Sequence, residues 1–479
     1  VSALRAEGYS IAVADVMGGM TARTIAARIS RSSAPAFQRS AIQGAVPKSG
    51  MVDRFFGWEL AVPEHFNQDL VLDITYDLAG MDAAAVRTVL DIIYEHHDVL
   101  RAVVREEALW INPPDGPDCP LLVETVEEDQ LQRAVDRIAA GLHTSFDLEQ
   151  GPLFTTALVS SPKSHRLVLV AHHLVIDIVS WYVIEDDIRL LLGKLANNRA
   201  LSLPARSATI REWAHQSMEF ARKGLERDKA YWDAAQRSVQ SDNLLIEQPN
   251  EEQSAPLVRR HVIGFEAVEA LQRASAAPGG LTVEEVVVGG LGRAARATTG
   301  QSRLVIALES HGRVEHPELP DVSRTVGWLT TLSPIVLTLS DDVHEVLLEA
   351  KEAVRGVPDY GIAWQAVPEE IRGIPILLSL NYLGSSAEPT EQVNRWFNQH
   401  GPAANEANAY SSGVTVNASI ERGHLVLIVA AEPGVADAEW LDTFAQHFHD
   451  ELYRLVQALQ EVEREYRTPS DLGGSEISL

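Results

Sequence analysis

Cysteine, positive charge and uninterrupted apolar runs are scarce in this chain of 479 residues. The single cysteine, Cys119, excludes an intramolecular disulfide framework and fits a reducing cytosol, so we expect a cytoplasmic protein. Lys and Arg number 40 against 67 Asp and Glu, and the net charge of -27 argues against nucleic acid or an anionic membrane as a partner. Residues 167–184 are apolar enough to resemble a membrane span. The ionisable His172, His173 and Asp177 argue against that reading, because such groups are costly in lipid.

Several chemical signatures are missing as well. The sequence has no phosphate-binding glycine loop, no G-x-S-x-G nucleophile elbow and no Cys/His cluster with the spacing of a metal site. We therefore expect no catalytic cofactor and no metal. The hydrophobic content of 46% is ample for substantial cores, and the length indicates about three domains of ordinary size.

The most informative segment is A-H-H-L-V-I-D-I-V-S-W, residues 171–181. The β-branched run before it predicts a buried strand over 166–171, and the apolar spacing after it predicts an amphipathic helix. A histidine can exchange a proton near neutral pH, and Asp177 is close enough along the chain to hold the loop that carries His173. Alone, the pattern is more typical of a core histidine pair with a structural aspartate. Neighbouring histidines on a strand point to opposite faces, which disfavours zinc.

The pattern H-H-x-x-x-D resembles the signature of the condensation-domain superfamily of nonribosomal peptide synthetases, and Ser180-Trp181 resembles its epimerization branch. Further segments that resemble motifs of the superfamily (H-H-D-x-L-R) or of that branch (the others) occur in the expected order across roughly residues 45–460. They are H-F-N-Q at 65–68, H-H-D-V-L-R at 96–101, E-S-H-G-R at 309–313, S-R-T-V-G-W-L-T at 323–330 and L-N-Y-L-G at 380–384.

Some positions depart from the family pattern. The glycine usual after the motif aspartate is Ile178, which lacks the conformational freedom of glycine, and the second position of E-G-H-G is Ser310. The late P-x-x-G-x-G-Y-G element is only partly present, and its bulky residues Ala363, Trp364 and Gln365 could narrow whatever the loop lines.

The resemblance implies an α/β fold of two lobes like chloramphenicol acetyltransferase, which form a V with a tunnel between them. We expect helices around 210–236 and 283–299, and strands at 259–265, 303–308 and 376–380, with Glu309, Asn381 and Tyr382 following their strands. The expected domains are the C-terminal half of a peptidyl carrier at 1–30, a linker at 31–44, the N-lobe at 45–239, an inter-lobe loop at 240–258, the C-lobe at 259–460 and a tail at 461–479.

The first residues read as short helices and resemble the second half of a peptidyl carrier domain. In that family the serine that bears phosphopantetheine lies shortly upstream, so it would fall before Val1. The alternative is a plain helical extension. The carrier interpretation implies an upstream carrier in cis as partner, with its phosphopantetheine arm as the substrate tether and other synthetase domains as neighbours.

The resemblance also implies the chemistry. Epimerization of a thioester-bound aminoacyl or peptidyl group removes the α-proton and returns one to the opposite face, which suits a base and an acid on opposite sides of an enolate. Our hypothesis is that His173 and Glu309 form this pair, with their roles exchanging with direction. Backbone N–H groups near His173, or the side chain of Asn381 or Tyr382, would stabilise the enolate oxygen.

The remaining motif residues are expected to support this pair. We assign Asp177 to structure, paired with Arg313 or Arg324, since its buried charge would otherwise be expensive. We expect His172 to point away from the tunnel, and we expect Ser180 and Trp181 to be a helix start and a core aromatic.

Two rival functions stay open from the sequence. A condensation domain would join two carrier-bound substrates through an amide bond and shares His173 and Asp177, but it does not normally combine all the other motifs. An inactive domain would only dock carriers, and Ile178, Trp364 and Gln365 keep that alternative in view.

Overall fold

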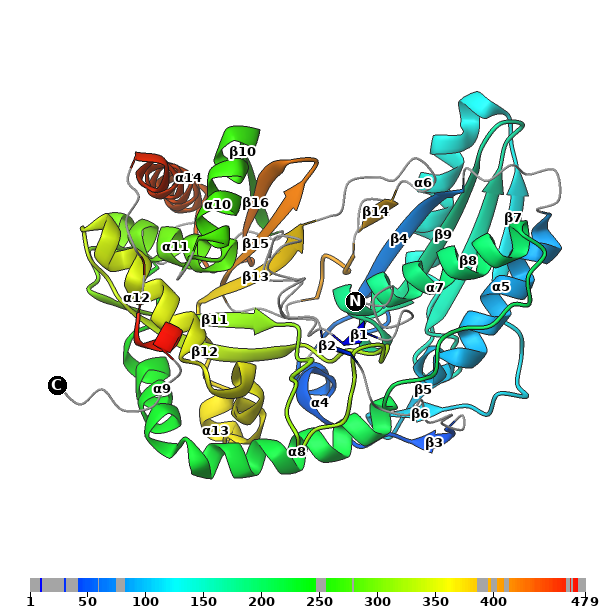
Figure 1. The fold of residues 1–479 in the computed structure, drawn as a ribbon, viewed down its shortest axis with the longest axis horizontal. Helices are drawn as coiled ribbons and strands as arrows, with labels where there is room; N and C mark the ends of the chain where they lie inside the picture. The colour runs from blue at the N-terminus through cyan, green and yellow to red at the C-terminus, as the bar shows by residue number, and fades with distance from the viewer. Residues whose placement is uncertain are drawn as a thin grey trace.

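The computed structural model describes most of the chain. The described residues are 9–10, 30–31, 42–58, 60–74, 82–246, 256–277, 280–385, 395–397, 403–408, 413–461, 466 and 468–472. They form the two-lobed α/β architecture expected from the sequence (Figure 1). No helix among these residues is long and apolar enough to cross a membrane.

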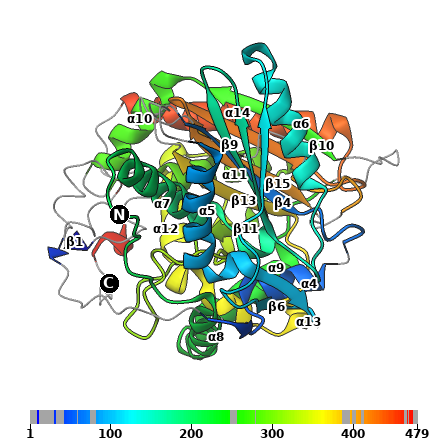
Figure 2. The same cartoon turned by 90° about the vertical axis from the view of Figure 1, so that its right-hand side faces the viewer.

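The N-lobe is built on a sheet with the strand order β14-β4-β9-β8-β7. The helix α6 covers one face of this sheet, and α5 and α7 cover the other, as Figures 1 and 2 show. Its elements are α4 (Gly50–Gly57), β4 (Asn67–Ile74), α5 (Ala83–His96), β7 (Leu121–Thr125), α6 (Leu131–His143), β8 (Phe154–Ser160), β9 (His165–His172) and α7 (Ile178–Ala196), with a small sheet of β3 (Gly44–Ala45), β6 (Ala108–Ile111) and β5 (Ala102–Arg105) beside them.

The C-lobe is built on a sheet with the order β10-β16-β15-β13-β11-β12. Helices α10, α11, α12 and α14 bury one face, whereas α9 and the turn η4 cover the β11 and β12 end of the other. Its elements are α9 (Lys229–Ser241), β10 (Leu257–Ile263), α10 (Phe265–Ala276), α11 (Val283–Thr299), β11 (Arg303–Ser310), β12 (Thr331–Thr338), α12 (Val343–Arg355), η4 (Pro358–Ala366), α13 (Glu369–Arg372), β13 (Leu378–Ser385), β15 (Val414–Glu421), β16 (His424–Ala431) and α14 (Ala438–Glu461).

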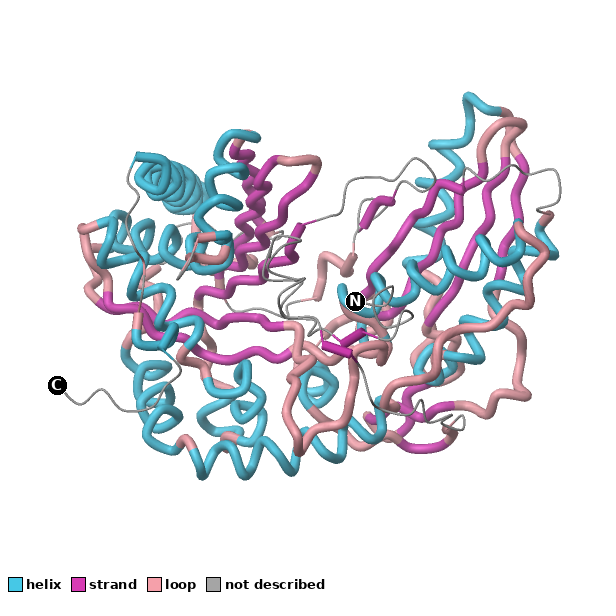
Figure 3. Tube along the Cα trace, in the orientation of Figure 1, coloured by secondary structure: helices cyan, strands magenta, loops and turns pink. Residues whose placement is uncertain are grey.

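The two lobes are joined by packing contacts as well as by the chain connection between them. The strand β14 (Arg395–Phe397) lies between β13 and β15 in sequence, yet it pairs with β4 of the N-lobe. Apolar residues of the loop between β11 and β12, among them Val314, Val326 and Trp328, are buried in the N-lobe core. The helix α8 (Ile210–Arg227) runs below the gap between the lobes (Figure 3). The lobes are therefore held together by a strand, a loop and a helix.

Several predicted element boundaries differ from the structure. The helix expected over 210–236 is two helices, α8 and α9, which meet at Asp228, and α9 packs on the C-lobe sheet although it falls mostly within the expected N-lobe range. Glu309 lies inside β11, and Asn381 and Tyr382 lie inside β13, instead of following them, because these strands keep pairing with their neighbours. Helix α11 has the expected bounds.

The predicted carrier half lies outside the described residues, apart from a strand pair. This pair joins β1 (Tyr9–Ser10) to β2 (Ser30–Arg31). Much of the predicted inter-lobe loop, 247–255, also lies outside the described residues. These domain boundaries stay predictions.

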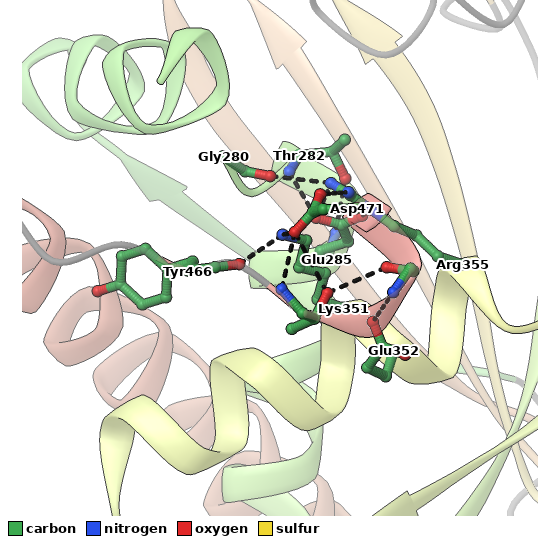
Figure 4. A network of polar contacts seen from close by, with 10 residues as sticks. Gly280, Thr282, Glu285, Lys351, Glu352, Arg355, Tyr466 and Asp471 are labelled. Atoms are coloured by element: carbon green, nitrogen blue, oxygen red, sulfur yellow. Dashed lines mark hydrogen bonds and ion pairs between the residues drawn. The ribbon is translucent and has the colours of Figure 1, made fainter. Parts of the chain in front are cut away.

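Part of the predicted tail is docked on α12 by ion pairs (Figure 4). The side chain of Lys351 is fully buried, and its Nζ lies 2.5 Å from the carbonyl oxygen of Tyr466 and 2.6 Å from Asp471 Oδ2. Arg355 joins the network at 2.7 Å from Asp471 Oδ1 and 2.6 Å from Glu285 Oε1. The turn η5 (Pro469–Leu472) is thereby fixed to the C-lobe.

We predict that Asp471→Ala frees this segment. Its removal takes away the carboxylate that pairs with the buried ammonium of Lys351, which we expect to weaken docking by about 2 kcal/mol. Hydrogen exchange of the backbone N–H groups of residues 468–472 should accelerate about 30-fold. The exposed pair of Asp341 and Arg296 supplies the control, Asp341→Ala, which should leave this exchange as in the wild type. Unchanged exchange in Asp471→Ala would contradict the docking role.

Candidate active site

The turn after β9 places the motif histidine. The strand ends at His172, a short turn spans His173–Val175, and α7 begins at Ile178. Asp177 is the N-cap of α7, and its Oδ1 accepts a hydrogen bond of 2.8 Å from the backbone N–H of Ser180. Because Ile178 already has helical geometry, this position does not need the conformational freedom of the family glycine.

His173 is held between aromatic rings. Its ring stacks on Phe66 with centroids 5.5 Å apart, and Trp328 of the C-lobe lies on it at 4.0 Å. The residue is partly exposed, although dense protein surrounds the ring. Desolvation by this burial lowers the pKa of the imidazole to about 4. His173 is therefore a neutral imidazole at neutral pH.

Gln68 contacts the imidazole edge of His173. Its Nε2 lies 2.8 Å from His173 Nε2, and its Oε1 accepts a hydrogen bond of 2.9 Å from the indole N–H of Trp181. Trp181 is 1% exposed and packs in the N-lobe core. The sequence motif H-F-N-Q contained Gln68 and Phe66, but the fold alone brings both to the histidine.

His172 faces away from His173 and is fully buried. Its Nε2 donates to the carbonyl oxygen of Pro63 at 2.8 Å, and its Nδ1 accepts from the backbone N–H of Leu174 at 3.2 Å. Burial lowers the pKa of this imidazole to about 3. His172 is thus a neutral group that ties the turn to the preceding segment.

A buried ion pair joins the lobes beside His173. The Nη1 and Nη2 atoms of Arg313 lie 2.8 and 2.9 Å from the two carboxylate oxygens of Asp177, and both side chains are 1% exposed. Asp177 also accepts from the backbone N–H of Leu329 at 3.0 Å, and Ser180 Oγ lies 2.7 Å from its Oδ1. Burial alone would raise the pKa of Asp177, but Arg313 and these hydrogen bonds outweigh it and hold the pKa below its ordinary value.

The E-S-H-G-R segment requires glycine at only one of the two positions where the family has it. Gly312 has φ +67°, and a Cβ there would lie 1.6 Å from the carbonyl oxygen of Leu329, so no other residue fits. Ser310 lies in β11, paired with Thr331 of β12, and needs no such freedom. The serine is therefore compatible with the local fold.

Glu309 belongs to a polar row across the C-lobe sheet. In the parallel register of β11, β13 and β15, Glu309 pairs with Asn381, which pairs with Asn417. All three lie on the sheet face opposite the helices α11 and α14 and are partly exposed. Desolvation, followed by the charge of Asp177, raises the pKa of Glu309 to about 7. Glu309 is therefore able to carry a proton near neutral pH.

The two strand residues proposed as oxyanion donors point to opposite faces. Asn381 shares the face of Glu309, whereas Tyr382 packs against the C-lobe core. Burial and the neighbouring Glu284 raise the pKa of Tyr382, which keeps its hydroxyl protonated. The backbone N–H groups of His173 and Leu174 are already donated to Phe66 and His172. Of these candidates, Asn381 is the one beside Glu309.

His173 and Glu309 lie within the influence of the same carboxylate. The charge of Asp177 acts on the pKa of both groups. Trp328 covers His173, and Leu332, four residues further on, is the register partner of Glu309. The Cα atoms of Trp328 and Leu332 are at most about 14 Å apart. The site thus brings one titratable group from each lobe to one region.

Arg324 serves a different carboxylate from Arg313. It pairs with Asp187 of α7, which also lies 2.9 Å from His97 Nε2. Within the described ranges, His96, His97 and Asp187 have potential metal-ligand atoms within 4.8 Å of one another. Because Arg324 and His97 already occupy the carboxylate, this group is satisfied by the protein itself.

The bulky residues of the late loop are absorbed by packing. Ala363 and Trp364 are buried with Trp232 against Val305, on the face of β11 that also carries Glu309, and Gln365 donates to the carbonyl oxygen of Ser217. The loop therefore braces α8 and α9 with these side chains.

Asn417 and Trp328 were not assigned to the site from the sequence. The run V-T-V-N-A-S-I at 414–420 alternates apolar and polar residues, which signals a strand with one polar face. That signal could have found Asn417, but its place beside Glu309 depends on strand order. Trp328 was visible only as part of a motif.

We predict that Arg313→Met is strongly destabilising, because it leaves the carboxylate of Asp177 buried and uncompensated. The expected loss in the apparent free energy of unfolding is about 3–5 kcal/mol, read from urea unfolding. The double variant Asp177→Asn, Arg313→Met removes both charges and should recover part of this loss. A single variant no less stable than the double one would show that the pair carries no such constraint.

Comparisons with known proteins agree with this architecture. The family model described as "Condensation domain" matches residues 55–477. Bacitracin synthase 3 of Bacillus licheniformis is 27% identical over 100% of this chain and 8% of its own length. Surfactin synthase subunit 1 of Bacillus subtilis (strain 168) is 26% identical over 100% of this chain and 14% of its length. The chain thus spans a small part of these relatives.

Solved structures show the same fold. The epimerization domain from the third module of tyrocidine synthetase B superposes with a TM-score of 0.77 at 22% identity, over 89% of this chain and 100% of that one. The first condensation domain of the calcium-dependent antibiotic synthetase, in complex with a substrate analogue, gives a TM-score of 0.65 at 18% identity, over 87% and 97% of the two chains.

Proposed function

The chain belongs to the condensation-domain family, and from this premise we propose that it is an epimerization domain of a nonribosomal peptide synthetase. Its reaction converts the L-aminoacyl or peptidyl thioester on a phosphopantetheine carrier into an L/D mixture at Cα. The observation that carries the proposal is that a neutral histidine, His173, and a carboxyl group of raised pKa, Glu309, come one from each lobe and both feel the charge of Asp177. The likeness to an epimerization domain in tyrocidine synthetase B supports it.

The step transfers two protons. His173 takes the α-proton, the Cα–H electron pair moves into an enolate of the thioester, and the Glu309 carboxyl group protonates Cα from the opposite face. The reverse direction uses the carboxylate as base and the imidazolium as acid. The pKa values of the free domain favour neutral His173 with protonated Glu309 as the resting pair.

The proposed substrate defines the partners. An upstream peptidyl carrier in cis would present its phosphopantetheine arm, and neighbouring synthetase domains would supply and consume the thioester. Asn381 and Asn417 lie in register with Glu309, where amide groups can hold the carbonyl groups of an aminoacyl or peptidyl chain.

We predict that His173→Ala and Glu309→Gln each lower epimerization by about 10²–10⁴-fold, since each removes one proton-transfer group. The assay is chiral analysis of several L-aminoacyl groups on a complete carrier joined ahead of this chain. His165→Ala, at the other end of β9, and Glu421→Gln, on β15, are matched controls that should keep wild-type rates.

Condensation is the competing outcome. The domain could instead form an amide with a downstream acceptor, in a reaction that needs His173 but not Glu309 and yields no D-product. That result would contradict the epimerase proposal. Carrier binding without either product would favour a docking domain.

The pH dependence follows from the two pKa values. The active pair carries one proton in total, whichever direction runs. Rates should rise as pH increases through the pKa of His173, about 4, and fall through the pKa of Glu309, about 7. A profile of kcat/KM against pH in Glu309→Asp should move the alkaline limb alone. An alkaline limb that stays unmoved would remove Glu309 from the proton transfer.

A further inference from the structure

We propose that Gln68, fixed by Trp181, holds the proton of His173 on Nδ1 and presents an amide N–H to the thioester oxygen of the substrate. The inference rests on the proposed function for its substrate. Its first half concerns the free domain and stands on the contacts of Gln68 alone. Gln68 would be a positioning residue for the base and a donor to the enolate.

The direction of each hydrogen bond follows from the donor at its far end. An indole nitrogen only donates, so the atom of Gln68 that lies 2.9 Å from Trp181 Nε1 is the amide oxygen. The amide nitrogen therefore faces His173 at 2.8 Å and donates. His173 Nε2 must accept with its lone pair, which places the ring proton on Nδ1. The buried Trp181 thus sets the tautomer of His173 indirectly, through the orientation of the Gln68 amide.

The amide has a second N–H. Among the described residues, Gln68 Nε2 makes no hydrogen bond other than the one to His173. Gln68 and His173 are both partly exposed, whereas their chain neighbours Asn67, Asp69 and His172 are buried. The remaining N–H is therefore carried beside the base by a side chain that is itself partly exposed.

The geometry suits an enolate oxygen. A Cα that gives its proton to His173 Nε2 lies about 3–3.5 Å from it, and the thioester oxygen is two bonds further on. The amide nitrogen, 2.8 Å from the same Nε2, is then within reach of that oxygen. Nε2 has a single lone pair, so the substrate displaces the Gln68 N–H from it before the α-proton is transferred. The displaced N–H can then donate to the thioester oxygen as charge develops there. A donor fixed in advance at such a position is what stabilises an oxyanion.

Competing donors on the N-lobe side are occupied. The backbone N–H of His173 is donated to Phe66 at 2.8 Å, and that of Leu174 to the ring of His172. Asn381 is in register with Glu309 on the C-lobe sheet. Gln68 is therefore the side-chain donor that the described N-lobe offers next to the base.

The first test reads the tautomer without substrate. The full chain is labelled with ¹⁵N-histidine, and the His173 signals are identified from their absence in His173→Ala. We expect a proton on Nδ1 in the wild type and a shift toward Nε2–H in Gln68→Glu, whose carboxylate accepts from the ring. Wild-type signals with the proton on Nε2 would overturn the proposal, whether or not the domain is an epimerase.

The second test measures epimerization in three variants. Gln68→Met should lower kcat about 100-fold, and Gln68→Glu should move the acid limb of the pH profile upward, because a carboxylate beside the imidazole favours its charged form. Trp181→Phe keeps an aromatic ring but removes the N–H that orients the amide, and we expect about a 10-fold loss. Trp232→Phe is the matched control, since Trp232 is equally buried and its N–H has no hydrogen-bond partner within the described part of the chain.

The outcomes separate the two proposals. An active wild type whose rate and acid limb are unmoved in Gln68→Met and Gln68→Glu would overturn the role of Gln68 and leave the epimerase intact. Equal losses of epimerization rate in Trp181→Phe and Trp232→Phe would show that Trp181 contributes through packing and not through its N–H. A wild-type domain that yields no D-product would contradict the proposed function. The tautomer measurement would then still test whether Gln68 holds the proton of His173 on Nδ1.

Discussion

The buried ion pair between Asp177 and Arg313 is the constraint on which the site depends. Both side chains are 1% exposed, so the cost of removing two charges from water is met only when the lobes bring them together in this geometry. The pair fixes the start of α7, the turn after β11 and, through Leu329, the segment that carries Trp328. The position of His173 relative to Glu309 is consequently a property of the closed lobe interface.

The same burial sets the protonation of the candidate pair. Removal from water disfavours charge on any group, so it lowers the pKa of an imidazole and raises that of a carboxyl group. His173 and Glu309 are shifted in these opposite directions, and the charge of Asp177 adds to the effect on Glu309. Desolvation on both sides of the lobe interface therefore yields a neutral base and a protonated acid, the arrangement that proton removal and return at one carbon require.

Local sequence patterns predicted the elements better than their contacts. The apolar run before His173, the helix after Asp177 and the bounds of α11 follow from periodicity and capping, and the motif order predicted the two-lobed fold. The sequence could not place Asn417 beside Glu309, because that depends on strand order. It could not show that Trp181 orients Gln68, since the two residues lie 113 positions apart and meet only through the fold.

The central claim is that two groups, one on each face of the substrate, exchange the α-proton. The most direct measurement is rapid-quench analysis in deuterated water of an L-aminoacyl thioester on a complete carrier joined ahead of this chain. With two groups, the first D-product carries deuterium at Cα while the remaining L-substrate keeps its protium. Deuterium entering the L-substrate as fast as the D-product would indicate a single base, and no deuterium in either would contradict the account.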